Sequence, residues 1–264
     1  MKQALTIAGS DSGGGAGIQA DLKSFHANGV YGLTVVTAVT AQNTIEVRES
    51  FELPVDLIES QIDAIFDDFD VSAVKTGMLS SARVVDVVAG RLGERGAPNL
   101  VVDPVMISTS GFELLETEAV VSVRERLLPL AALVTPNLRE AQLLAGIPVE
   151  NMDSAKEAAR IIFESGCSAV LVKGGHLSGS IDAVDVLFDG SGETVFSTAR
   201  LPGGSPHGTG CTLSAAIAAN LARGQRLAFA VENAKAYVTE AIRRGLSIGR
   251  GPGPAQHFFS GRES

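Results

Sequence analysis

Residues 5–18 read Leu5-Thr6-Ile7-Ala8-Gly9-Ser10-Asp11-Ser12-Gly13-Gly14-Gly15-Ala16-Gly17-Ile18. The run before Gly9 is mostly apolar, as expected of a strand buried between two layers, and the glycine-rich turn leads into a helical pattern that reaches Phe25. A strand, a tight turn and a helix in this order make up half of a β-α-β unit. The stretch therefore predicts an α/β protein with a parallel sheet.

The same alternation recurs along the rest of the chain. Further strand-like runs occupy residues 33–39, 71–75, 100–103, 133–136 and 170–173. Helical spacing of apolar residues occupies the windows 58–66, 84–92 and 155–162, and the expected N-cap of the last helix is Asp153 or Ser154. Residues 183–188 and 194–198 flank Asp189-Gly190-Ser191-Gly192, which predicts a hairpin. We predict a three-layer α-β-α sandwich whose central sheet is mostly parallel with an antiparallel edge, in a single domain over residues 1–264.

Composition and charge narrow the class of partner. The formal net charge of -9 and a pI near 5.0 disfavour nucleic acid and anionic membrane surfaces. No apolar run approaches the roughly 20 residues of a membrane span, and residues 1–3 lack the apolar core of a signal peptide. Two cysteines, Cys167 and Cys211, offer neither a disulfide framework nor a metal knuckle. We expect a cytoplasmic protein without a nucleic-acid or membrane partner.

A second glycine turn, His207-Gly208-Thr209-Gly210-Cys211-Thr212, leads into a helix of small residues. The unpaired N–H groups and the positive dipole end of such a helix favour a phosphate or a developing oxyanion. Cys211 lies in that first turn, so a lowered thiol pKa is expected. His207 and Cys211 need not face each other across the turn, and no third residue orients them, so a covalent thiol mechanism is disfavoured.

Polar residues stand where several predicted strands end, which is where open α/β sheets bind ligands. Each could instead be only a turn former or a helix cap. Together they indicate a common rim, on which Asp103 and Glu140 could hold Mg²⁺ directly or through water and Lys173 could approach a nucleotide phosphate. The set comprises Lys75-Thr76, Asp103, Asn137 with Glu140, and Lys173-Gly174-Gly175-His176.

Two common nucleotide-binding motifs are missing. Residues 9–17 lack the G-x-G-x-x-G spacing and no acidic residue ends the second strand, so a dinucleotide site has weak support beside a plain strand-to-helix turn. No Walker A motif occurs, so phosphates must be held in another way. Cys167, before an apolar strand, is expected to be a small buried residue. The stretch 249–253, rich in Gly and Pro, is expected to be a loop before a weakly ordered end.

Nearly the whole chain resembles the hydroxymethylpyrimidine/phosphomethylpyrimidine kinases of thiamine biosynthesis, which belong to the ribokinase-like superfamily. The matching motifs are residues 8–23, Thr40-Ala41-Gln42-Asn43-Thr44, Lys75-Thr76-Gly77-Met78-Leu79, Val102-Asp103-Pro104-Val105-Met106, Thr135-Pro136-Asn137, Lys173-Gly174-Gly175-His176 and the turn at residues 207–212. The resemblance implies transfer of the ATP γ-phosphoryl group to 4-amino-5-hydroxymethyl-2-methylpyrimidine and then to its monophosphate. It also implies Mg²⁺ and a homodimer.

The resemblance assigns roles to individual residues. It implies that the pyrimidine binds near Gly9, Asp21, Gln42, Met78 and Val105, with the Gln42 amide suited to an aminopyrimidine edge. It implies ATP near Asn137, Lys173 and Lys235, metal near Asp103 and Glu140, and an anion hole at Gly208, Thr209 and Gly210. Cys211 stands where sugar kinases of the superfamily carry an Asp base, and a modest thiol base suffices for a loose transition state. Pro206 replaces a Thr found in many relatives and removes a hydroxyl and an N–H.

The sequence leaves three other functions to compare with this one. Pyridoxal kinase is the nearest alternative, although Gln42 and Met78 favour the pyrimidine. A non-catalytic nucleotide sensor is disfavoured because Asp103, Glu140 and Cys211 are all present. A nicotinamide-dependent dehydrogenase is disfavoured by the missing ribose-binding acid.

Overall fold

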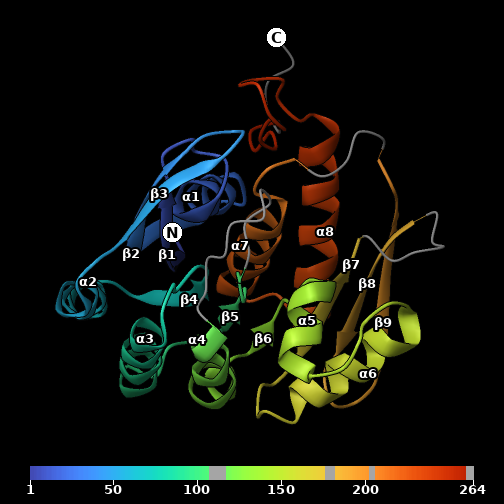
Figure 1. Ribbon diagram of the computed structural model, residues 1–264, viewed down its shortest axis with the longest axis horizontal. Coiled ribbons are helices and arrows are strands. Elements are labelled where there is room, and N and C mark those ends of the chain that lie inside the picture. Colours follow the sequence, from blue (N-terminus) through green and yellow to red (C-terminus); the bar gives the residue numbers. More distant parts are fainter. Residues whose placement is uncertain (107–116, 176–181, 202–205, 260–264) are drawn as a thin grey trace.

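The computed structural model describes residues 1–106, 117–175, 182–201 and 206–259. Within these residues nine strands form one sheet in the order β3-β2-β1-β4-β5-β6-β7-β8-β9 (Figure 1). The strands are β1 Gln3–Asp11, β2 Tyr31–Gln42, β3 Val47–Glu52, β4 Val71–Thr76, β5 Leu100–Val102, β6 Leu133–Val134, β7 Val170–Gly174, β8 Asp182–Phe188 and β9 Glu193–Ala199.

The sheet is parallel across its middle and antiparallel at both edges. The strands from β2 to β7 pair in parallel, whereas β8 pairs antiparallel with both β7 and β9. The mostly parallel sheet and the hairpin edge predicted from the sequence are confirmed. β3 adds a second antiparallel edge beside β2, which the sequence did not reveal because Val47–Glu52 is largely charged and exposed.

Helices cover both faces of the sheet, so the three-layer sandwich is confirmed. Helices α1, α7 and α8 pack on one face, with α7 and α8 side by side in Figure 1, and α2, α3, α5 and α6 pack on the other. The bounds are α1 Gly17–Ala27, α2 Val55–Asp68, α3 Ala82–Glu94, α4 Thr117–Ser122, α5 Leu138–Ala145, α6 Met152–Phe163, α7 Thr209–Ala222 and α8 Leu227–Arg243. A π-helical turn, Val123–Leu127, and a 3₁₀ turn, Leu128–Leu130, follow α4.

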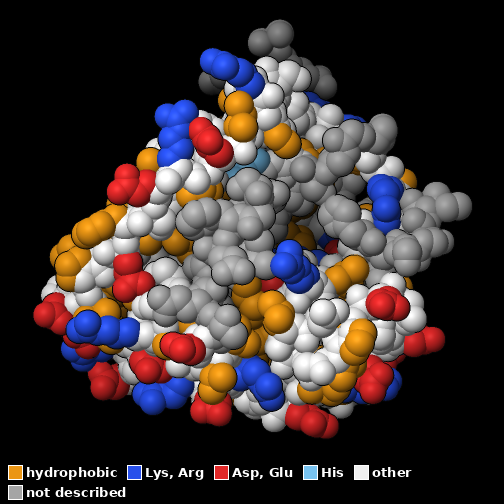
Figure 2. Space-filling model, viewed as in Figure 1, with side chains coloured by type: hydrophobic (Ala, Val, Ile, Leu, Met, Phe, Trp, Pro, Cys, Tyr) orange, Lys and Arg blue, Asp and Glu red, His pale blue; other side chains and the backbone are white. Residues whose placement is uncertain are grey.

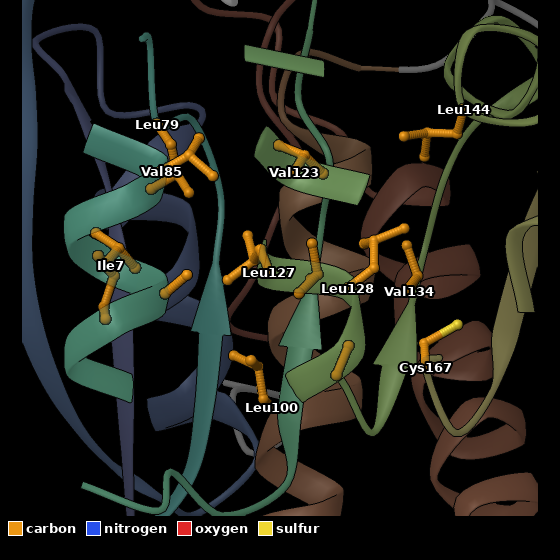
Figure 3. Packing of buried hydrophobic residues seen from close by; sticks show 14 of the residues in the cluster. Ile7, Leu79, Val85, Leu100, Val123, Leu127, Leu128, Val134, Leu144 and Cys167 are labelled. Carbon is orange, nitrogen blue, oxygen red and sulfur yellow. The ribbon is translucent and has the colours of Figure 1, made fainter. Parts of the chain in front are cut away.

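Two hydrophobic clusters hold the layers together. Successive strand residues point to opposite faces, so Val102 packs in one cluster and Val101 in the other. Figure 3 shows the larger cluster, in which Cys167 packs as the small buried residue expected from the sequence. Helix α7 is buried from Thr212 to Ala222, because its many alanines let it lie close to the sheet between α1 and α8. This burial fixes the start of α7 firmly over the ends of the strands.

The start of α6 differs from the sequence expectation. The N-cap is Asn151, whose side chain accepts a hydrogen bond from Ser154 N at 3.0 Å, rather than Asp153 or Ser154. Ser154 is instead the third residue of the helix, and its hydroxyl accepts a hydrogen bond from Asn151 N at 3.1 Å. This reciprocal pair is a capping box in which Ser takes the place of the usual Glu. The predicted N-cap was wrong by two or three residues because Asn, Asp and Ser side chains can all cap a helix.

We expect Asn151→Ala to lower the free energy of unfolding by about 1 kcal/mol, because it leaves the first amides of α6 without an acceptor. Asp153→Ala, in the first turn but outside the capping box, is expected to cost only a few tenths. Urea unfolding of both variants measures the difference. Equal losses would mean that Asn151 does not act as the cap.

The segment after α8 is a loop that is tied to the rest of the molecule. Gly251 N donates to Thr44 Oγ1 at 3.1 Å, and His207 N donates to Gly253 O at 3.2 Å. The predicted loop at residues 249–253 is confirmed, and it is anchored to both the β2–β3 turn and the approach to α7. The end that the sequence predicts to be weakly ordered begins after this loop, and its last residues, 260–264, lie outside the described residues.

The surface carries charges of both signs. Figure 2 shows Lys and Arg side chains interspersed with Asp and Glu on the face in view. In the part of the chain that the structure describes, no helix has the length and apolar character needed to cross a bilayer.

Candidate active site

A cavity of about 850 Å³ opens at the carboxyl ends of the parallel strands, beside the first turn of α7. It gathers residues from distant parts of the sequence, as expected where parallel strands end at one edge. All but one of the residues expected at the site line it: Gly9, Gln42, Met78, Asp103, Val105, Asn137, Glu140, Lys173, Gly208, Thr209, Gly210, Cys211 and Lys235. The exception is Asp21, which lies beneath the cavity.

The start of α7 depends on a glycine at position 208. Gly208 has a φ of 84°, and a Cβ built there would lie 1.8 Å from the carbonyl oxygen of Gly15. Only glycine permits both the left-handed backbone and this approach. No side chain caps the helix, and the amides of Gly210 and Cys211 have no hydrogen-bond acceptor among the described residues. Two free N–H groups and the helix dipole therefore face the cavity and favour an anion there.

A lysine and two carboxylates stand next to this turn. Lys173 Nζ lies 2.8 Å from Asp103 Oδ1 and 3.4 Å from where a Cβ on Gly210 would be. Ser214, one turn along α7, donates to Asp103 Oδ2 at 3.0 Å. Burial opposes ionisation of Asp103, but the charges of Lys173 and Lys75 outweigh it and lower the Asp103 pKa. Asp103 is therefore an anion held in place from two sides.

Glu140 is the second buried carboxylate. It belongs to the capping box of α5, in which Asn137 N donates to Glu140 Oε2 at 2.8 Å and Glu140 N donates to Asn137 Oδ1 at 3.0 Å. Burial and the nearby Asp103 charge raise the pKa of Glu140 to about 7, although Lys173 works in the opposite direction. Two carboxylates that share one lysine have spare negative charge, so this donor set fits a hard dication such as Mg²⁺. Among the described residues, no group of three or more His, Cys, Asp or Glu gathers as a larger metal cage.

Lys75 and Asp21 form a fully buried ion pair below the cavity. Lys75 Nζ lies 3.1 and 2.9 Å from the two carboxylate oxygens of Asp21, and Thr6 Oγ1 donates to Asp21 at 2.6 Å. Burial disfavours the ammonium, yet the negative charge of Asp21 keeps the pKa of Lys75 above its usual value. Asp21 therefore does not line the cavity itself, and its partner Lys75 does. The sequence signal for a buried, partnered Lys75 was a lone lysine inside the mostly apolar run 71–76.

Cys211 lies in the cavity wall, but its thiol is not activated. Burial raises the pKa of Cys211 to about 11, and the positive charge of Lys75 only partly offsets this because Asp21 and Asp103 act in the same direction as burial. The expected lowering of the thiol pKa is contradicted. A helix start lowers the pKa of a well-solvated thiol, but Cys211 is partly buried, and the loss of solvation outweighs the effect of the helix start.

One side of the cavity is closed by α8 and the β8–β9 hairpin. Lys235 Nζ lies 2.6 Å from Asp185 Oδ2 on β8, and both residues line the cavity. Asp185 was missed by sequence analysis because its partner is 50 positions away. Pro206 O accepts a hydrogen bond from Thr209 Oγ1 at 2.8 Å. Although Pro206 has no N–H to donate, its carbonyl therefore still stabilises the turn before α7. His176 and residues 202–205 lie outside the described residues.

The glycine-rich stretch at residues 9–17 is a strand-to-helix turn held by Asp11. The Asp11 carboxylate accepts hydrogen bonds from the backbone amides of Gly13, Gly15 and Ala16 at 2.8 to 3.0 Å. It also lies 3.1 Å from His207 Nε2, so it links this turn to the one that starts α7. His207 Nε2 lies 2.9 Å from Gln42 Nε2 in turn.

Free amides at a helix start, with lysines and buried carboxylates around them, suit a migrating phosphoryl group. In this sheet topology they define a kinase of the ribokinase-like class. The chain belongs to the phosphomethylpyrimidine kinase family, whose model matches residues 11–256.

Curated relatives and solved structures agree with that assignment. The chain is 51% identical to a hydroxymethylpyrimidine/phosphomethylpyrimidine kinase of Streptomyces coelicolor over 97% of its own length and 94% of the relative's. It superimposes on phosphomethylpyrimidine kinase of Clostridium difficile with a TM-score of 0.82 at 45% identity, covering 92% of this chain and all of the other. An ADP complex of Bacillus subtilis pyridoxal kinase gives a TM-score of 0.91 at 39% identity, with 97% of each chain covered. The expected family, fold and kinase activity are confirmed, and the family uses ATP.

Proposed function

We propose that this protein transfers the γ-phosphoryl group of ATP to the hydroxymethyl oxygen of 4-amino-5-hydroxymethyl-2-methylpyrimidine, and then a second one to the resulting monophosphate. The observation that carries the proposal is the first turn of α7, whose two free amides face a cavity that Gln42, Met78 and Lys173 also line. Membership of the family supports the same substrates.

In the proposed reaction the hydroxymethyl oxygen forms a bond to the γ-phosphorus while the bond to the β,γ-bridging oxygen of ATP breaks. ADP leaves, and the hydroxyl proton passes to a phosphate oxygen or to water. The amides of Gly210 and Cys211 hydrogen-bond the oxygens of the moving group, and Lys173 compensates their charge. Positioning and charge compensation account for most of the acceleration when the transition state is loose.

The substrate ring would lie between the β1 and β4 ends. Gly9 leaves room there, since a Cβ at this position would lie 3.3 Å from Met78 Sδ. The Gln42 amide can pair with the amino group and the adjacent ring nitrogen of the pyrimidine at once. Val105 completes the apolar wall. These roles rest on the lining of the cavity and on the family resemblance.

The triphosphate would run past Lys173 toward Asn137 and Lys235, with Val238 and Ile242 of α8 as an apolar wall for the base. Asp103 and Glu140 would hold Mg²⁺, directly or through water. When bound, Mg²⁺ neutralises phosphate charge. The resemblance also supports a homodimer and a cytoplasmic location, and both are part of this proposal.

Pyridoxal kinase is the second candidate, favoured by the close superposition on a pyridoxal kinase. The test incubates purified protein with Mg-ATP and the hydroxymethylpyrimidine, its monophosphate or pyridoxal, and follows product mass. We expect both pyrimidines to be phosphorylated. Turnover of pyridoxal alone would move the assignment to the second candidate.

We expect Cys211→Ala to slow the first phosphorylation by less than about 10-fold, because a thiol with a pKa near 11 is protonated at neutral pH and a loose transition state needs little base. The second transfer should change less, because its acceptor phosphate oxygen is already ionised. Rates measured separately with each substrate test this. Cys167→Ala, at a buried cysteine that does not line the cavity, is the control. Equal losses in both steps would show that Cys211 only shapes the cavity.

A further inference from the structure

The hydrogen bonds around Gln42 cannot all form when its amide nitrogen lies beside His207. If Gln42 Nε2 points toward His207, then His207 Nε2 must accept a hydrogen bond from it at 2.9 Å. The same ring nitrogen faces the Asp11 carboxylate at 3.1 Å, to which it then has no proton to donate. At the other end, Thr40 Oγ1 must give its single proton both to Ser10 O at 3.0 Å and to Gln42 Oε1 at 3.2 Å. In this orientation each end therefore lacks one donor, toward Asp11 at the first end and toward Ser10 O or Gln42 Oε1 at the second.

Asp11 decides between the two orientations. Its carboxylate accepts three backbone amides and has a lowered pKa, because hydrogen bonds from His207 and from Ala16 and Gly13 outweigh the opposing effect of burial. An anion at 3.1 Å requires the proton on His207 Nε2. That N–H can hydrogen-bond to Gln42 only if the amide oxygen, Oε1, is the atom that faces it. Turned this way, Nε2 donates to Thr40 Oγ1, whose own proton is free for Ser10 O, and the His207 Nε2–H is shared between two acceptors, Asp11 Oδ2 and Gln42 Oε1.

We propose that His207, held by Asp11, is the positioning residue that fixes which end of the Gln42 amide is carbonyl and which is amino, and that it thereby tunes the enzyme toward an aminopyrimidine. The inference rests on the proposed function, because it concerns recognition at the same site. An amide keeps one lone pair and one N–H for a ligand after His207 and Thr40 have been served. His207 determines which end of the Gln42 amide offers the lone pair to the ligand and which end offers the N–H.

That order matters for one substrate more than for the other. The pyrimidine presents its 4-amino group and the neighbouring ring nitrogen as an adjacent donor and acceptor, and its hydroxymethyl group must face α7, so only one amide orientation pairs with both. In pyridoxal the ring nitrogen and the phenolic hydroxyl are separated by a methylated carbon, so they cannot pair with both ends of a single amide. Loss of the fixed orientation should weaken binding of the pyrimidine selectively.

The test measures dissociation constants of the hydroxymethylpyrimidine and of pyridoxal by calorimetry without ATP, together with KM and kcat. We expect His207→Leu to weaken pyrimidine binding about 10-fold, as for one lost hydrogen bond, with little change for pyridoxal. kcat should stay within about threefold, since the backbone of residue 207 remains bonded to Gly253 O. His207→Gln, whose amide can donate to both neighbours, should restore most of the affinity.

A second variant displaces the His207 imidazole without replacing His207 itself. A Cβ at Gly15, whose φ is not left-handed, would lie 2.6 Å from His207 Cδ2, so Gly15→Ala should displace the imidazole and weaken pyrimidine binding as well. Gly90→Ala, with open space around its Cβ, is the matched control.

An unchanged ratio of the two dissociation constants in folded His207→Leu and Gly15→Ala would overturn the inference. So would an equal fall in kcat for both substrates without a change in binding, because that would assign His207 to the phosphate turn. If the wild-type protein phosphorylates neither pyrimidine, the proposed function fails instead, and the binding ratio still tests the inference by itself.

Discussion

Gly208→Ala is expected to lower kcat at least about 100-fold, the loss seen when one preorganised donor to a developing anion is removed. A methyl group at this position would lie 1.8 Å from the carbonyl oxygen of Gly15, and the φ of 84° disfavours any side chain. The turn must therefore move, and the amides of Gly210 and Cys211 move with it. Steady-state rates with the hydroxymethylpyrimidine measure the effect, and thermal unfolding shows whether the variant is folded.

Gly224 provides a matched control at the other end of α7. It has a φ of 82°, but a Cβ there meets nothing within 4 Å. Gly224→Ala should thus share the backbone strain, about 1 kcal/mol of stability, and keep its activity. If both variants lose activity in parallel with stability, the clash at Gly15 is not the cause. A fully active Gly208→Ala would contradict the role given to this turn.

Lys173→Met is expected to lower kcat/KM for ATP by about 100-fold or more. The lysine compensates Asp103 at 2.8 Å and stands next to the start of α7, so its removal leaves the phosphoryl group without a cation and two buried carboxylates without their counter-charge. Lys156→Met is the control, because it removes a lysine whose partner, Glu193, lies at the surface. Kinetics with varied ATP measure the change.

A double variant separates charge compensation from catalysis. Removing Lys173 alone strands a buried charge, which costs about 3–5 kcal/mol of stability. Lys173→Met combined with Asp103→Asn neutralises both partners and should recover much of that stability without recovering activity. Recovery of both would mean that Lys173 acts only by holding the fold together.

Sequence reasoning predicted the site where the signal is local. A glycine turn before a helix of small residues and polar residues at strand ends can be read from a few neighbouring positions. Of these residues, one cavity is lined by Gly208, Gly210, Lys75, Asp103, Asn137, Glu140 and Lys173. The antiparallel edge strand β3 was missed because Val47–Glu52 has no buried face of its own and owes its conformation to pairing with β2.

Pairings between distant residues could not be predicted in the same way. The partner of Lys75 is 54 positions away, and the fully buried ion pair arises only when β4 and α1 meet. The Cys211 pKa was wrong for a related reason. Its position at the start of α7 is local, but its pKa is raised by burial and by the negative charges of Asp21 and Asp103, which come from other elements.

The contact between Gly15 and Gly208 has a consequence for how the molecule forms. It joins segments almost two hundred positions apart, and α7 also packs against β1 and β4 from the first part of the chain. Contacts of such high sequence separation are slow to form because a long loop must close first. During synthesis, the sheet strands up to β7 can emerge and pair before the anion-binding turn exists, so nucleotide affinity should arise only after α7 has left the ribosome and docked.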